Sequence, residues 1–244
     1  MIDPRGSVVD ARMSGIGRIV SFCSAKGGVG KTFCTVAAGL ALAGAGRRVG
    51  MLDLDFQGAS AHIFLGEKPR LPREDRGILP LTAAGGIRFM TVAAFTGERA
   101  LALRGAETSD AILELLAVTQ WGDLDYLFID MPPGIGEEVL DVARLVPRTE
   151  ALVVCTPSAV SVAVVSRLVA VLDSIHVPVR GVVANMVRAD AAGVREMARR
   201  SGVPYAGEVP FDPDLEAAIG DPPALGALAA SRALAAVLGA AGYR

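Results

Sequence analysis

The chain has 244 residues, of which 52% are hydrophobic and 5% aromatic, with a formal net charge of −2. This length suits one large α/β domain with a sizeable core, and the balanced charge excludes a global attraction to nucleic acid or to an anionic membrane. The three cysteines argue against a disulfide framework, and we find no apolar run of about 18 residues and no apolar leader, so we expect a cytoplasmic protein.

In chain order, residues 1–16 are predicted to form a loosely held tail, followed by a single domain over 17–244. Short apolar runs then alternate with helical patterns. The predicted strands are 18–24, 48–54, 87–93, 125–131, 150–156, 179–185 and 205–209, and the predicted helices are 31–46, 107–120, 136–146, 158–175, 190–202 and 224–240. Strands that are apolar throughout and separated by helices indicate an α/β fold, with a mostly parallel sheet of about seven or eight strands and helices on both faces.

A glycine-rich segment, KGGVGKT, spans residues 26–32 directly after the apolar run 18–23. Glycines let the backbone wrap closely, so that successive N–H groups and the start of the next helix face an anion. Lys31 adds a charge for the terminal phosphates, and the Thr32 hydroxyl can ligate Mg²⁺. The predicted nucleotide-binding set is Gly27, Gly28, Val29, Gly30, Lys31 and Thr32.

Two residues at the front of this loop depart from the general phosphate-loop pattern. Ala25 stands where that pattern has a glycine, which predicts an ordinary backbone conformation there. Lys26 is a second lysine beside Lys31, and a solvated surface lysine is the simple alternative for it.

Carboxylates follow two of the predicted strands. Alternation along the strand sends Asp53 and Asp55 to the same side, near the end where the phosphates would lie. Asp130 ends an apolar strand, as expected of an acid that holds Mg²⁺ through its water shell. The alternative for all three is that they cap helices or turns.

Two further segments predict a site for the base. Asn185 closes a strand, and its amide offers both a donor and an acceptor to an adenine edge. Pro210, Phe211 and Asp212 would close over the other side of the purine. Each signal is weak alone, because asparagine often caps a helix, but together with the loop they favour ATP over GTP.

The heptad KGGVGKT resembles the deviant Walker A loop of the MinD/ParA/Mrp ATPases, in which the front lysine reaches the partner subunit's nucleotide. WGDLDYLFIDMPPGIGEEVLDVARLVP (121–147) resembles the Mrp-type branch, as do 104–116, 152–186 and 202–218. The resemblance implies a homodimeric, slowly hydrolysing Mg²⁺-dependent ATPase that carries or inserts iron–sulfur clusters. It implies catalytic roles for Lys26 and for Asp55, which would orient the attacking water, with Asp53 in support.

The sequence departs from the Mrp-type pattern at two places. The first bears on the cargo of the protein and the second on its branch within the family. Mrp-type proteins hold the cluster on a Cys-x-x-Cys pair after the Asn-Met motif, but 187–193 reads VRADAAG, and Phe56-Gln57-Gly58 is nearer to the ParA version. We therefore expect ATP and Mg²⁺ as cofactors, whereas an iron–sulfur cluster lacks its family ligands. The three cysteines are expected to be core residues.

The leading hypothesis is an ATP-driven factor for metallocluster or metalloprotein assembly, partnered by a cysteine-bearing relative or a metalloprotein client. The alternative is a MinD- or ParA-like spatial organiser. Membrane binding needs a basic amphipathic terminal helix, yet the last predicted helix and tail carry only Arg232 and Arg244. DNA binding needs a basic patch, for which Arg195, Arg199 and Arg200 are the best local cluster. Neither a membrane nor a nucleic acid is the expected partner.

Overall fold

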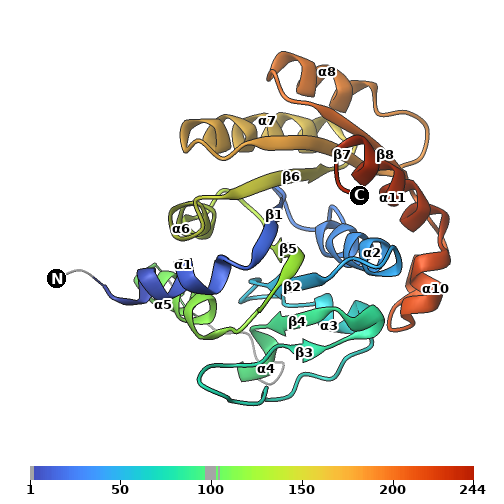
Figure 1. The fold of residues 1–244 in the computed structure, drawn as a ribbon. Coiled ribbons are helices and arrows are strands. Elements are labelled where there is room, and N and C mark those ends of the chain that lie inside the picture. The colour runs from blue at the N-terminus through green and yellow to red at the C-terminus, as the bar shows by residue number, and fades with distance from the viewer. Residues whose placement is uncertain (1–2, 97–102, 104) are drawn as a thin grey trace.

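The computed structural model describes residues 3–96, 103 and 105–244, and one eight-stranded sheet runs through them (Figure 1). Its spatial order is β3-β4-β2-β5-β1-β6-β7-β8. Every neighbouring pair is parallel except β3 with β4. The predicted α/β fold with a mostly parallel sheet is confirmed. The strands are β1 (Ile16–Cys23), β2 (Val49–Asp53), β3 (Leu81–Thr82), β4 (Arg88–Thr91), β5 (Leu124–Asp130), β6 (Thr149–Cys155), β7 (Val179–Val187) and β8 (Tyr205–Pro210).

Helices cover both faces of this sheet. One buried cluster joins it to α1 (Arg5–Met13), α5 (Ala106–Val118), α6 (Glu137–Leu145), α7 (Ala159–Ser174) and α8 (Ala192–Arg200). A second cluster joins the other face to α2 (Lys31–Gly44), α10 (Pro222–Ala227) and α11 (Ala229–Ala240). Figure 1 shows these three helices on one side of the sheet. Short helices lie between these elements: α3 (Ala61–Phe64), α4 (Ala93–Thr96), α9 (Leu215–Ala218) and the 3₁₀ turn η1 (Ala84–Gly86).

The central strands are buried on both faces, which explains why they read as continuous apolar runs. In β1, Ile19 and Cys23 belong to the first cluster, whereas Val20 and Phe22 belong to the second. Successive strand residues point to opposite faces, so each face receives alternate side chains. The Phe22 ring meets the Phe128 ring of β5 edge-on, with centroids 5.5 Å apart. The sheet is thereby a rigid base for the loops at its carboxyl ends.

Besides the short helices, the structure differs from the predictions at the N-terminal tail, at β3 and in the last predicted helix. The tail was predicted to be loosely held, but residues 5–13 form α1, because Val9 and Met13 lie four positions apart and are buried against the core. The strand β3 is only two residues long and antiparallel, so it carries no periodic signal. The single helix predicted over 224–240 is divided at Leu228, whose φ of −60° and ψ of 148° are extended.

Candidate functional site

The glycine-rich loop joins β1 to α2 at the carboxyl end of the sheet. Gly28 and Gly30 have φ of 76° and 79°, a left-handed conformation that a side chain disfavours, and Gly30 caps α2. Ala25 lies outside this region, as predicted, and so does Gly27. The loop lines a cavity of about 270 Å³, whose other walls include Asp55, Ser60 and Pro133.

The cation and hydroxyl of the loop converge on one carboxylate. The Lys31 ammonium lies 2.6 Å from Asp130 Oδ1, and Thr32 Oγ1 donates to Asp130 Oδ2 at 2.7 Å. Thr35, one helical turn further along α2, donates to Oδ1 at 2.9 Å. Lys31 is 6% exposed and Asp130 is fully buried, so each charge is compensated inside the protein. Thr35 is a contributor that the sequence analysis missed.

Asp53 and Asp55 have different surroundings, although they are two positions apart. Asp53 lies beside Asp130 in the register of β2 and β5 and is fully buried. Its carboxylate accepts hydrogen bonds from the backbone N–H groups of Asp55, Ser60 and Ala61, each at 3.1 Å. It therefore holds the segment after β2 in place and does not line the cavity, which fits a supporting role.

The Asp55 carboxylate is held in a turn that faces the cavity. Its Oδ1 accepts hydrogen bonds from the backbone N–H groups of Gln57 and Gly58, at 3.2 and 2.8 Å. Asp55 is partly exposed and lines the phosphate-sized space with Lys31 and Thr32. Its position allows it to act on a molecule bound there.

Burial, and then the charge of Asp130, raises the pKa of Asp53 to about 7. An unfolded aspartic acid has a pKa of about 3.9, so between these values the folded chain retains a proton that the unfolded chain has lost. The contribution of this proton to the free energy of unfolding is complete below about pH 4 and is lost as the pH rises to about 7.

We expect the free energy of unfolding of the nucleotide-free protein, relative to the Asp53→Asn variant, to fall by up to about 1.4 kcal/mol per pH unit between about pH 4 and 7. Urea unfolding of both proteins across this range measures the slope. Only the pH dependence of the difference in unfolding free energy tests the prediction. The absolute difference does not, because the amide in the Asp53→Asn variant also disturbs the hydrogen bonds from the backbone N–H groups. A difference that rises with pH would mean that the charged carboxylate is the native form.

Asn185 is placed against the loop. Its Nδ2 donates to the Val29 carbonyl oxygen at 2.8 Å, and the residue is 3% exposed. A Cβ at Gly30 would clash with that nitrogen, so a side chain at this position would have to displace the Asn185 amide. Asn185 thus supports the loop in this structure, a role that the sequence analysis did not foresee.

Pro210 is the last residue of the edge strand β8, and Phe211 and Asp212 follow it. The lining residues of the cavity include none of the three. Phe211 is 40% exposed, and the Arg188 guanidinium carbon lies 3.6 Å from the centre of its ring. The Asp212 carboxylate accepts hydrogen bonds from the backbone N–H groups of Ala230 and Asp214. Asp212 therefore anchors this turn to the start of α11, and Arg188 is a further residue that sequence reasoning missed.

Lys26 is exposed on the rim of the cavity. The turn after β5 borders the same cavity through Pro133. Lys26 and Lys31 are thus separated by the loop, one facing solvent and the other buried.

The three cysteines do not form a metal site. All are buried, and burial raises the pKa of the Cys23 and Cys155 thiols to about 12 and that of Cys34 further still. Across the described residues, no three histidine, cysteine or acidic side chains are grouped to hold a metal ion. Thiolates are the normal ligands of iron–sulfur clusters, so this donor set does not fit one.

The arginines of α8 are paired with carboxylates. Arg195 lies 2.9 Å from Glu208, while Arg199 and Arg200 share Glu196 at 2.8 and 2.6 Å. The structure therefore does not favour a DNA-binding face on this helix. None of the helices in the described part of the chain has the length and apolarity needed to span a bilayer.

A glycine-rich loop between a strand and a helix, with a buried lysine, a hydroxyl and a strand-end carboxylate around it, defines a P-loop nucleotide-binding protein. The family model described as "ParA: NUBPL iron-transfer P-loop NTPase" matches residues 15–236. The chain belongs to this family.

Curated relatives with similar sequences have related names. An iron-sulfur cluster carrier protein of Saccharolobus solfataricus is 35% identical over 224 residues, which cover 85% of this chain and 75% of the relative. The iron-sulfur cluster carrier protein of Escherichia coli (strain K12) is 36% identical over 71% of this chain and 48% of its own length. A chloroplastic Fe-S cluster assembly factor, HCF101 of Arabidopsis thaliana, is 35% identical over 84% of this chain and 41% of the relative. The chain thus spans less than half the length of the last two.

Solved structures share the fold. A nucleotide-binding protein from Archaeoglobus fulgidus in complex with ADP superimposes with a TM-score of 0.76 and 28% identity, covering 91% of this chain and 93% of that one. The cell division ATPase MinD of Pyrococcus furiosus gives a TM-score of 0.69 at 21% identity, covering 92% and 98%. At that lower identity the likeness concerns the fold alone.

Proposed function

We propose that this protein is a Mg²⁺-dependent ATPase that works as a homodimer in the assembly of metalloclusters. The observation that carries the proposal is the convergence of Lys31, Thr32 and Asp130 beside the glycine-rich loop. These residues supply a cation for the terminal phosphates, and a hydroxyl and a carboxylate for the metal. The names of the curated relatives support the metallocluster role.

The oxygen ligands fit Mg²⁺. Thr32 Oγ1 and Asp130 Oδ2 lie 2.7 Å apart, and Mg²⁺ is usually held by one or two such groups together with waters and phosphate oxygens. Mg²⁺, when bound, would neutralise part of the phosphate charge. Lys31 would exchange Asp130 for a phosphate oxygen when a nucleotide binds, so the buried ion pair keeps the ammonium group beside the loop.

For hydrolysis, we assign Asp55 to orient the attacking water, because its carboxylate is fixed by two backbone N–H groups at the cavity wall. Lys26, exposed on the rim, would reach the nucleotide of a second copy. The exposed side chain of Ile135, just beyond the Pro133 turn, offers apolar contact area to that copy. Positioning and electrostatic stabilisation would supply most of the catalysis.

Adenine recognition is assigned to the turn after β8. The exposed Phe211 ring offers a flat surface for the base, and Asp212 holds the turn in place. Asn185 would contact both the loop and the base, because its hydrogen bond to the Val29 carbonyl oxygen uses only Nδ2 and leaves Oδ1 as an acceptor for the base.

Phosphate release in the presence of ATP tests the enzymatic part of the proposal. We expect slow turnover with Mg²⁺ and none after chelation with EDTA, because the metal has to neutralise the transferred phosphate. Turnover that is equal in EDTA would contradict the role of Thr32 and Asp130.

Anaerobic reconstitution with iron and sulfide tests whether the isolated chain itself binds an iron–sulfur cluster. We expect the purified protein to remain colourless and free of iron, because its thiols are buried and belong to no metal-holding group among the described residues. The chain would then act beside a cysteine-bearing relative or a metalloprotein client. A stoichiometric cluster on the isolated protein would contradict this assignment.

A further inference from the structure

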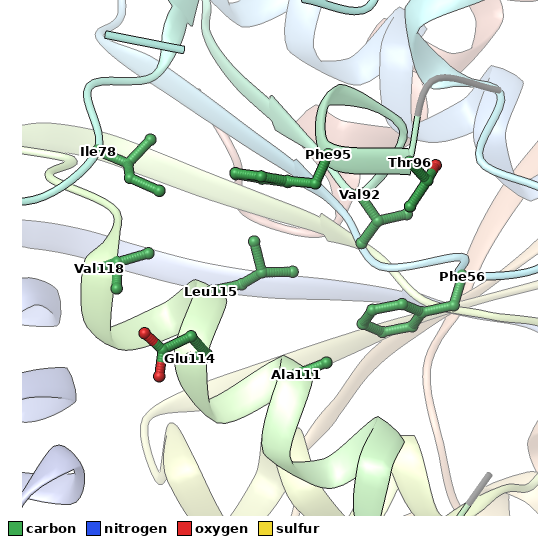
Figure 2. Close-up of a pocket in the computed structure, with 9 residues that line it drawn as sticks. All are labelled: Phe56, Ile78, Val92, Phe95, Thr96, Ala111, Glu114, Leu115 and Val118. Carbon is green, nitrogen blue, oxygen red and sulfur yellow. The ribbon is translucent and has the colours of Figure 1, made fainter. Parts of the chain in front are cut away.

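A second cavity, of about 240 Å³, lies between α5 and the segments that follow β2 and β4. Figure 2 shows the rings of Phe56 and Phe95 and the side chain of Leu115 lining the same space. Ala111, one turn before Leu115 on α5, lines it as well. The walls are almost entirely apolar, which suits the side chain of a partner rather than a polar ligand.

The floor of this pocket is buried, and one wall is open to solvent. Phe56 is 9% exposed and Leu115 8%, whereas Phe95 is 43% exposed. An exposed aromatic ring beside an apolar hollow is unfavourable in water and often marks an interaction site. The volume accommodates one bulky apolar side chain at the packing density of a protein core.

Negative charge lies at one side of the pocket, at Glu114 and around the neighbouring Arg5. Among the described residues that line the pocket, Glu114 is the one with an ionisable side chain, which is 55% exposed. Its ion pair with Arg5 is long, at 3.4 Å, because that guanidinium also contacts Asp3 at 2.8 Å and Asp110 at 2.6 Å. Three carboxylates share one cation, so a positive charge brought by a partner would be attracted here.

We propose that this pocket is the docking site for a partner-protein segment that inserts one bulky apolar side chain and places a lysine or arginine against Glu114. Phe56, in the pocket wall, directly follows Asp55 in the wall of the nucleotide cavity. A docked partner would therefore contact the segment that carries the proposed water-orienting carboxylate. The docking site goes beyond the proposed function and does not require ATP hydrolysis.

A random peptide library displayed on phage tests this site on the nucleotide-free protein. Selection on the wild type, with counter-selection on Ala111→Trp, should enrich peptides with a bulky apolar residue a few positions from a lysine or arginine. A synthetic peptide from the selection should lose at least about tenfold in affinity to Ala111→Trp, whose indole fills the pocket, and about threefold to Glu114→Gln. Ala192→Trp, which adds the same ring on exposed α8, should leave the affinity unchanged.

The Phe95→Ala variant decides the matter if Ala111→Trp does not fold, because it removes only an exposed wall and should weaken the peptide at least about fivefold. Peptides that lack the apolar and cationic pair, or that bind Phe95→Ala and Glu114→Gln as well as the wild type, would overturn the proposal. A change in oligomeric state of Phe95→Ala without peptide would assign the pocket to a second copy of the chain and would also overturn it.

Discussion

Replacing Lys31 with alanine is expected to lower nucleotide affinity by about a hundredfold, because a charge-assisted hydrogen bond to phosphate contributes about 1.5–3 kcal/mol. Titration calorimetry with ADP measures this loss. The exposed Lys26 is the matched control, because Lys26→Ala removes the same charge from the other end of the loop. We expect Lys26→Ala to bind ADP within about threefold of the wild type.

The same Lys31→Ala substitution should also destabilise the nucleotide-free protein. Asp130 is fully buried, and its ion pair with Lys31 is 2.6 Å long. Removing one partner of a buried pair costs about 3–5 kcal/mol, although the hydroxyls of Thr32 and Thr35 still contact the carboxylate and reduce that cost.

A double variant, Lys31→Ala with Asp130→Asn, removes both charges and should recover part of the lost stability. Urea unfolding of the single and double variants gives the coupling between the two residues. Additive losses would contradict a direct ion pair between Lys31 and Asp130 in the nucleotide-free protein.

Replacing Asp55 with asparagine should slow ATP hydrolysis by about a hundredfold or more and leave ATP affinity nearly unchanged. The carboxylate lines the cavity, and a positioned acid or base typically contributes about 10²–10⁴ to a rate. The asparagine oxygen can still accept the hydrogen bonds from Gln57 and Gly58, so the turn is kept and only the charge is lost.

Single-turnover phosphate release and nucleotide titration separate the two effects. Asp55→Ala, which removes the turn contacts as well, is the companion variant and should accumulate as an ATP-bound dimer. If Asp55→Asn hydrolysed ATP at the wild-type rate, another group would have to orient the water.

The sequence was most informative where the chemistry is local. The two-sided burial of β1 and β6 produces largely apolar runs, so these strands could be located from residue type alone. The loop glycines and Lys31 are contiguous, and Asp130 ends an apolar run, so this part of the site was predictable as well. The two-residue β3 and the extended Leu228 inside an Ala/Leu-rich segment leave no periodic signal.

Contacts between distant segments could not be predicted in this way. The hydrogen bond from Asn185 to Val29 joins residues 156 positions apart, and its existence depends on the approach of β7 to the loop. The ring contact between Arg188 and Phe211 depends on the pairing of β7 with β8. The N-terminal helix α1 is held by the burial of Val9 and Met13 in a cluster that includes α5. The segment is short and contains glycine and proline, so its sequence alone did not predict this helix.

In the proposed function, two copies of the chain complete each other's ATP sites, with Lys26 acting on the partner's nucleotide. Mixing Lys26→Ala with Asp55→Ala tests it most directly, since each variant alone should be inactive. A mixed dimer would contain one complete site, formed by Asp55 of one subunit and Lys26 of the other, so an equal mixture should regain up to about a quarter of wild-type ATP hydrolysis. A mixture that stays inactive while mixed dimers form would contradict the account.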